Sequence, residues 1–301
     1  MKRTVTIPAT FISIALGVLI ALAGSQGSEL YNGVALFALC ASVSYLLHWI
    51  IFIPSYIYQT EHYFDLTGSI SYLSAIGLGF YLNPSMDPRD LLIGVLIVIW
   101  AVRLGTFLFS RVKQDGKDGR FTIMKTQFHW YIMTWTLGGL WVFLTMAAGL
   151  AAITSNVNIP LGVMAYLGLA LWILGFSIEV IADKQKRDFK KQQNKEKEYI
   201  TSGLWAWSRH PNYFGEITLW AGLTLIALPV LSGWQLVTLI SPIFVYVLLT
   251  RISGIPMLEN RGMKKWGSDP EYIDYLERTP SLLLKKPNKS VSYTHLTLPT
   301  T

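Results

Sequence analysis

Residues 160–191 read PLGVMAYLGLALWILGFSIEVIADKQKRDFKK and join a long apolar run to a basic end. The hydrocarbon core of a bilayer is about 30 Å thick, and about 20 mostly apolar residues of α-helix are needed to cross it. The run up to Ala182 has this length, and five Lys or Arg residues follow before position 192. The stretch therefore predicts a membrane-spanning helix over 160–182 whose last turns leave the bilayer.

The composition of the whole chain supports this reading. Of its 301 residues, 52% are hydrophobic and 14% are charged, whereas soluble domains contain about 25% charged residues. These values exclude a disordered or collagen-like chain. The single cysteine, Cys40, excludes an internal disulfide framework. A soluble globular enzyme is also disfavoured.

Seven further segments have comparable length and apolar character. We therefore expect an all-α, polytopic integral membrane protein with about eight transmembrane helices. Seven spans are possible, because the third segment is weakened by Asp65 and several serines. The expected spans are 7–24, 33–54, 63–82, 91–110, 132–153, 160–182, 213–231 and 237–252.

The distribution of Lys and Arg tests this layout. With a cytoplasmic N-terminus and alternating sides, 23 of the 25 basic residues fall on the cytoplasmic side. Such a bias is typical of membrane proteins. We therefore expect both termini in the cytoplasm. The net charge of +7 then faces membrane lipids and does not indicate a nucleic-acid partner.

Charged residues near the cytoplasmic end of the sixth span form one helix face. Glu179, Asp183 and Arg187 are spaced four apart, and Lys190 follows close to that face. Lys and Arg side chains at a helix end extend into water and form ion pairs, which explains Arg187 and Lys190. They explain Glu179 poorly, because charged groups at membrane depth are costly and usually functional.

The stretch GLWAWSRHPNYFGEITLW at 203–220 predicts the start of the seventh helix. Pro211 suits a first helical turn, where its missing N–H costs nothing. A helix N-terminus beside Arg209 is a ready anion site. His210, Asn212 and Glu216 follow in the same stretch. The alternative is an interfacial anchor built from aromatic residues such as Trp205 and Tyr213; we include both in the candidate site.

Two further regions carry candidate residues. Arg103 lies half way along the fourth span, and Arg120 lies in the polar turn after that span. Tyr63 and Asp65 open the third span and could transfer a proton. The sequence has no GxGxxG motif after a strand, no P-loop and no zinc-ligand spacing. We therefore expect no Rossmann domain and no metal.

Seven motifs resemble the steroid 5-alpha-reductase C-terminal superfamily, and most closely its bacterial DUF1295 branch. The resemblance covers about residues 100–275. The motifs are W-A-V-R-L-G at 100–105, D-G-R-F at 118–121, G-F-S-I-E-V-I-A-D at 175–183, T-S-G-L-W at 201–205, S-R-H-P-N-Y-F-G-E at 208–216, S-G-I-P-M-L-E at 253–259 and E-Y-I-D-Y at 271–275.

The resemblance implies a membrane-embedded oxidoreductase that acts on CH–CH groups. NADPH would enter from the cytoplasm and lie among the later helices. The substrate would be a lipid-like small molecule, of steroid or isoprenoid type, with a carbon–carbon double bond conjugated to a carbonyl. The implied cofactor-binding residues are Arg103, Arg120, Glu179, Asp183, Arg187, Lys190, Trp205, Arg209, His210, Asn212, Tyr213 and Glu259.

The sequence departs from the steroid enzymes at several positions. Their early Gln-Glu pair is absent, with Asp65 the nearest equivalent, and Trp100 stands where they have a Tyr. Glu259 lies near the place of their late His. A steroid is therefore not carried over as the substrate. The candidate catalytic residues are Asp65, Tyr63 and Glu216.

The expected organisation has three parts. Residues 1–85 would form N-terminal spans on the substrate side, 86–286 a reductase-like domain with the NADPH pocket, and 287–301 a disordered or non-native tail. Two other functions stay open. The first is an S-adenosylmethionine-dependent methyltransferase of the isoprenylcysteine or phospholipid type, which shares the R-H-P-x-Y-x-G pattern. The second is a transporter or scaffold. A transporter would show two matched halves, which are not visible in the sequence.

Overall fold

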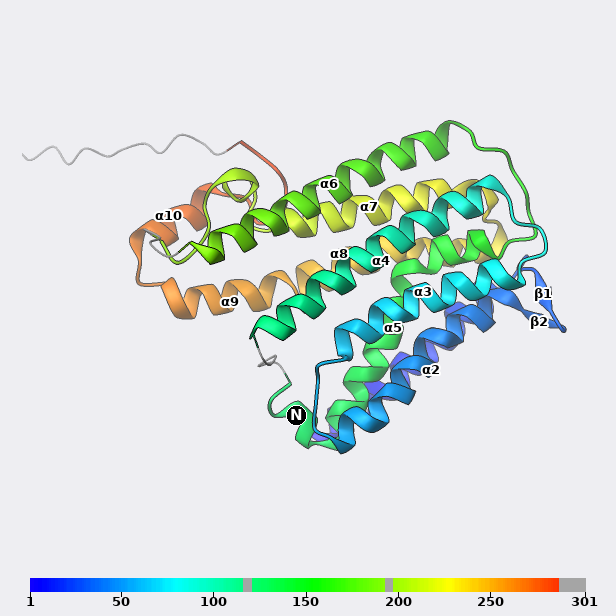
Figure 1. Cartoon of the computed structure of the whole chain (residues 1–301), viewed down its shortest axis with the longest axis horizontal. Helices are drawn as coiled ribbons and strands as arrows, with labels where there is room; N and C mark the ends of the chain where they lie inside the picture. The colour runs from blue at the N-terminus through cyan, green and yellow to red at the C-terminus, as the bar shows by residue number, and fades with distance from the viewer. Residues whose placement is uncertain (116–120, 193–196, 287–301) are drawn as a thin grey trace, which may run out of the picture. The chain divides into compact units, whose positions relative to one another are not determined.

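The computed structural model describes the backbone of residues 1–115, 121–192 and 197–286. Side chains are described for the same residues except 111–115. The described chain is almost entirely helical (Figure 1). The main helices are α1 Arg3–Gly24, α2 Leu36–Ile57, α3 Phe64–Leu82, α4 Pro88–Asp115, α5 Phe128–Ile153, α6 Val163–Lys191, α7 Pro211–Ala227, α8 Ile240–Val247, α9 Ile255–Trp266 and α10 Pro270–Arg278.

Short elements connect these helices. They are a two-stranded antiparallel hairpin, 3₁₀ turns and one π-helical turn. The hairpin is β1 Leu30–Tyr31 with β2 Val34–Ala35, the 3₁₀ turns are η1 Met124–Thr126, η2 Gly203–Ala206, η3 Leu228–Val230 and η4 Gly233–Leu239, and the π turn is η5 Leu248–Ile252.

Seven helical segments in the described ranges are long and apolar enough to cross a membrane. They are Arg3–Gly24, Leu36–Ile57, Pro88–Ser110, Phe128–Ile153, Val163–Lys191, Pro211–Val230 and Gly233–Trp266. The expectation of an all-α, polytopic membrane protein is confirmed, with seven spans by this measure. The eighth expected span is the helix α3, whose 19 residues include Asp65 and buried Thr67, Ser69 and Ser71.

The described chain forms two compact units. The first comprises Met1–Ile173 and Thr218–Tyr246, and the second comprises Leu174–Ile217 and the described residues from Val247 onward. The chain therefore leaves the first unit within α6 and returns to it within α7. In the first unit, α2, α3 and α5 lie side by side (Figure 1). Every residue of α5 from Val142 to Ile153 is buried, so this helix forms the core of the unit.

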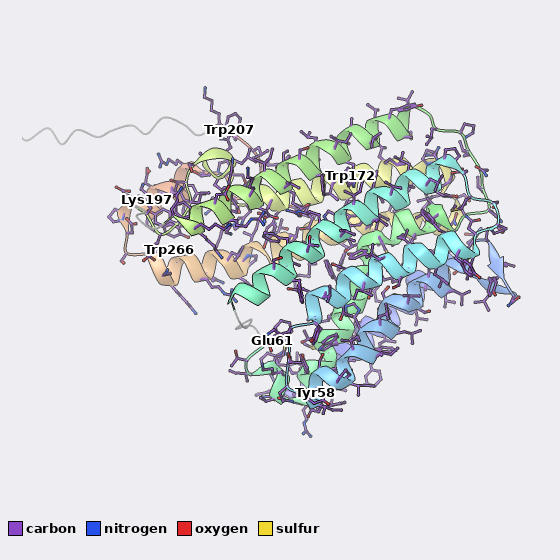
Figure 2. The ribbon with its side chains drawn as sticks, in the orientation of Figure 1. Tyr58, Glu61, Trp172, Lys197, Trp207 and Trp266 are labelled. Carbon is purple, nitrogen blue, oxygen red and sulfur yellow. The ribbon has the colours of Figure 1, made fainter. Side chains whose placement is uncertain are left out.

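Aromatic side chains and an ion pair make contacts between elements of the first unit. The rings of Trp100 and Trp220 meet edge to face with centroids 4.9 Å apart, and the Tyr72 ring lies 5.3 Å from Trp100. Glu61, labelled in Figure 2, lies in the loop before α3. Its buried carboxylate lies 2.6 Å from the Lys125 ammonium. This pair joins the loop before α3 to η1, so Glu61 is held as a structural counter-ion.

A group of aromatic rings packs together in the second unit. The Tyr199 ring lies 4.9 Å from Tyr272 and 5.4 Å from Trp266. Three consecutive residues before η2 make side-chain contacts with α10, with α9 and with the N-cap of α10. The pairs are Lys197–Glu271 at 2.5 Å, Glu198–Lys265 at 2.7 Å and Tyr199–Asp269 at 2.8 Å.

Arg89 fixes the end of α7 within the first unit. Its side chain is almost fully buried, with 1% exposed. The guanidinium donates to the carbonyls of Ile159 at 3.1 Å and Pro160 at 3.0 Å, and also to the carbonyl of Ile226 in the last turn of α7. Because the last carbonyls of a helix have no partner inside the helix, this arginine acts as a C-terminal cap.

We predict that Arg89→Met lowers the stability of the chain by about 2–4 kcal/mol, because the buried Ile226 carbonyl and two partly buried carbonyls lose their donor. The measurement is the thermal unfolding of the detergent-solubilised protein. Arg251→Met is the matched control, since Arg251 is exposed. Equal unfolding temperatures for the two variants would contradict the capping role.

Candidate functional site

The candidate site begins at the N-terminus of α7. This helix starts at Pro211, as the sequence predicts. The carbonyl of His210 accepts the amides of Tyr213 at 3.1 Å and Phe214 at 3.2 Å, which closes the first turn. The ring of His210 stacks on the ring of Tyr213, with centroids 5.5 Å apart and planes 9° from parallel. The first turn therefore holds the imidazole in one orientation.

A glycine allows α7 to lie directly against α6 in the second unit. A Cβ atom on Gly215 would stand 2.6 Å from the Gly175 carbonyl oxygen and 2.7 Å from the Glu179 backbone nitrogen. Real side chains do not tolerate such contacts with backbone atoms, which cannot move aside. The two helices therefore approach closely only because position 215 has no side chain.

This close approach brings the polar faces of α6 and α7 together. The Asn212 amide donates to an Asp183 carboxylate oxygen at 3.2 Å. Asp183 is 8% exposed and Glu179, one turn earlier on α6, is 3% exposed. Buried carboxylates are stable only where they are paired or hydrogen-bonded. The sequence predicts both acids and Asn212 as one site, and the structure brings the three residues together.

Three side chains lie around one carboxylate oxygen of Glu259 on α9. Its Oε1 lies 3.2 Å from Nη2 of Arg209 and 3.4 Å from Nε2 of His210. It also accepts the Ser281 hydroxyl at 3.1 Å. Within the described residues, Nε of Arg209 and both ring nitrogens of His210 are buried without a geometrically satisfied hydrogen bond. The carboxylate therefore offsets the charge of Arg209 and leaves polar nitrogens of both residues unsatisfied.

Trp205 is buried in the second unit, where it contacts α6. Its indole N–H donates to the Ala182 carbonyl at 3.0 Å, and its own carbonyl accepts the Tyr275 hydroxyl at 2.8 Å. The ammonium of Lys186 lies 4.6 Å from the centre of the ring. Trp205 is therefore buried as a structural contact between η2 and α6, and it places a cation at the same face of α6 as Asp183.

The other candidate residues are spread more widely. Arg187 and Lys190 are exposed on α6, and Glu216 is half-buried one turn after Asn212. Tyr63, Asp65 and Arg103 belong to the first unit. Tyr63 is exposed at the N-cap of α3, Asp65 lies in its first turn, and the Arg103 guanidinium lies 5.6 Å from the Phe107 ring. Arg120 lies outside the described residues.

The sequence interpretation missed two residues of the second unit, Lys186 and Ser281. Lys186 lies beside Trp205, and its charge also acts on His210. Ser281 lies after α10 and reaches Glu259. Lys186 follows Asp183 by three residues, so helical spacing alone could have included it. No local pattern connects Ser281 to a carboxylate 22 positions earlier.

Burial changes the acid–base behaviour of His210. Removal from water lowers the pKa of its imidazole below the usual 6.5, while the hydrogen bond and charge of Glu259 act in the opposite direction. The cations Lys186 and Arg209 lower the pKa further. The arrangement therefore favours the neutral form of the imidazole, which lies between a carboxylate and two cations.

The chemistry of this cluster suits a polar ligand with anionic groups. The dipole at the N-terminus of α7, Arg209 and Lys186 supply positive charge. Among the described residues, no group of three or more His, Cys, Asp or Glu side chains could hold a metal ion. Hydrogen-bond donors and fixed charges are therefore the groups that the described site offers a ligand.

The fold and the cluster define a polytopic α-helical membrane protein with a charged polar site built on α6, α7 and α9. The chain belongs to the DUF1295 family, which is described as a protein of unknown function and whose model matches residues 50–279. This confirms the DUF1295 resemblance read from the sequence. No curated protein and no solved structure matches the chain.

Gly215→Ala tests the close approach of α7 to α6. The added methyl meets backbone atoms, so we expect a loss of about 1–3 kcal/mol of stability. Gly77→Ala is the matched control, because nothing lies within 4 Å of a Cβ at that helical position. That control should gain about 0.5–1 kcal/mol, as is usual for alanine over glycine in a helix. Thermal unfolding measures both changes, and equal behaviour would refute the contact.

The titration of His210 predicts a pH dependence of stability. Because burial lowers the pKa of His210 in the folded chain, unfolding takes up protons just below pH 6.5. The stabilising contribution is therefore complete above the unfolded pKa and is lost as pH falls through the folded pKa. Unfolding temperatures between pH 8 and pH 5 should fall less steeply for His210→Gln than for the wild type. His62→Gln, at an exposed position, should follow the wild type; a His210→Gln curve of unchanged steepness would contradict the assignment.

Proposed function

We propose that the protein is a membrane-embedded, NADPH-dependent reductase. Its substrate is a lipid-like molecule of steroid or isoprenoid type, with a carbon–carbon double bond conjugated to a carbonyl group. The observation that carries the proposal is the cluster at the start of α7, where Arg209, His210, Asn212, Asp183 and Glu259 meet. The motif resemblance to the steroid 5-alpha-reductase superfamily supports the same function.

The basic side of the cluster fits a dinucleotide phosphate. The dipole of α7 places partial positive charge at its N-terminus, beside Arg209. Arg209 adds a planar guanidinium with an unpartnered Nε among the described residues, and guanidinium groups bind phosphate through paired hydrogen bonds. Lys186 contributes further charge at the adjacent face of α6. Arg187 and Lys190 are exposed on α6 and suit the additional 2′-phosphate of NADPH.

The acidic side of the cluster fits the polar parts of the cofactor. Asp183 fixes the Asn212 amide, so the remaining polar atoms of Asn212 keep defined positions, and Glu179 is buried one turn before Asp183 on the same helix. Such groups orient a carboxamide or ribose hydroxyls by hydrogen bonding. Bound NADPH would supply a hydride to the double bond, and the chain would orient the reacting partners.

The proton that completes the reduction must come from a donor near the substrate. Asp65 and Tyr63 of the first unit and Glu216 of the second are the proposed donors. A donor placed at the substrate carbonyl also stabilises the negative charge that develops on its oxygen. We further propose that the site faces the cytoplasm of a bacterial inner membrane, since nearly all basic residues fall on that side of the expected topology.

A methyltransferase that uses S-adenosylmethionine is the second candidate. The specific observation in its favour is the number of carboxylates in the cluster, since Glu179, Asp183 and Glu259 suit a cationic sulfonium ligand. The basic residues around Arg209 favour the phosphate-bearing cofactor, because S-adenosylmethionine carries no phosphate. The two candidates therefore differ in a property that a binding experiment reads directly.

We predict that the detergent-solubilised full chain binds NADPH, and that Arg209→Ala weakens binding at least about tenfold by removing a charge-assisted hydrogen bond. Isothermal titration calorimetry with NADPH, NADH and S-adenosylmethionine measures this. Arg251→Ala removes the same charge at an exposed position of the second unit and should bind like the wild type. Asn212→Ala should abolish reduction of enone lipids with folding intact.

Two outcomes would overturn the proposal. If the protein binds S-adenosylmethionine and does not bind NADPH, the methyltransferase becomes the better-supported function. Equal loss of NADPH affinity in Arg209→Ala and Arg251→Ala would show a general charge effect and would remove the α7 cluster as the binding site.

A further inference from the structure

The segment after α10 runs back along the residues that begin α7. The backbone N–H of Arg209 donates to the Pro280 carbonyl at 2.9 Å, and the N–H of Lys285 donates to the Trp207 carbonyl at 3.0 Å. The Ser208 hydroxyl donates to the Leu282 carbonyl at 2.8 Å. Residues 279–286, here named the return segment, are therefore fixed beside the Arg209–His210 pair by hydrogen bonds that use mainly backbone atoms.

One side chain of the return segment points to a different partner. The Ser281 hydroxyl donates to Oε1 of Glu259 at 3.1 Å. The same oxygen lies 3.2 Å from Arg209 and 3.4 Å from His210. Ser281 thus makes the shortest of the three contacts. Glu259 is 30% exposed, so without a fixed donor its carboxylate is free to turn toward water.

The charges around His210 make the position of this carboxylate matter. The imidazole is faced by Lys186 from α6, by neighbouring Arg209, by the Tyr213 ring from α7 and by Glu259 from α9. Glu259 is the one anion among these four described groups. If it turned away, His210 would lie between two cations with no counter-ion, and Arg209 would lose the partner that orients its guanidinium.

We propose that Ser281 is a positioning residue, a proposal that rests on the function proposed above. Its hydroxyl holds the Glu259 carboxylate where it orients Arg209 and His210 for the phosphate groups of the nucleotide. Ser281 acts through Glu259 and does not touch the nucleotide itself. A variant that keeps the hydroxyl keeps the effect, and a variant that removes it alters both the titration of His210 and the affinity for nucleotide.

The test compares Ser281→Ala with Ser281→Thr, which retains a hydroxyl, in the detergent-solubilised full chain. Ser253→Ala is the matched control, because Ser253 is an exposed serine of the same unit whose hydroxyl donates to Leu248. The chain has five histidines, so labelling them with carbon-13 allows NMR titration of His210, with His210→Gln assigning its signal. NADPH affinity is measured on the same samples.

We expect Ser281→Ala to lower the pKa of His210 in the same direction as Glu259→Gln, and to weaken NADPH binding about fivefold to tenfold. Ser281→Thr and Ser253→Ala should match the wild type in both measurements. A structural role alone would lower the unfolding temperature and leave the titration of His210 unchanged.

Other outcomes separate this inference from the proposed function. An unchanged His210 titration in Ser281→Ala overturns the positioning role, whether NADPH affinity falls or not. A wild-type chain that binds no NADPH overturns the proposed function. In that case the titration of His210 still decides whether Ser281 holds Glu259 in place.

Discussion

The second unit depends on the direct contact between the backbones of α6 and α7 at Gly215. Since this position has no side chain, the Gly175 carbonyl and the Glu179 amide of α6 lie where a Cβ would otherwise stand. The contact sets the distance between Asp183 and Asn212 at 3.2 Å. In membranes, where lipid and leucine are equally apolar, close approach through small residues is a main source of helix association. Here the same contact that joins the helices also assembles the polar cluster.

The cluster combines charges of both signs. Glu259 of α9 lies near Arg209, His210 and Ser281 through one oxygen, and Lys186 and Arg209 supply positive charge around His210. Buried ion pairs contribute little net stability, because the cost of removing charges from water offsets their attraction. A network of this kind is better explained by binding, since it holds donors and charges in place for a polar ligand before the ligand arrives.

The sequence predicted the fold well because each expected span is a local property. Apolar runs of sufficient length located seven spans, and Pro211 located the start of α7. The i,i+4 spacing also predicted that Glu179 and Asp183 share a face. Contacts made across long separations were not predictable in this way. Glu259 entered the candidate site only through the family resemblance, and its bond to Ser281 had no sequence signal, because the return segment after α10 has neither periodicity nor a motif.

Hydrogen–deuterium exchange of the full chain with and without NADPH tests whether the nucleotide binds at the start of α7. We expect slower exchange in the first turn of α7 and in the part of α6 around Asp183 when NADPH is present, because the nucleotide would cover these amides or stabilise their helices. Unchanged exchange at both places at a saturating NADPH concentration, or protection confined to the first unit, would contradict this expectation.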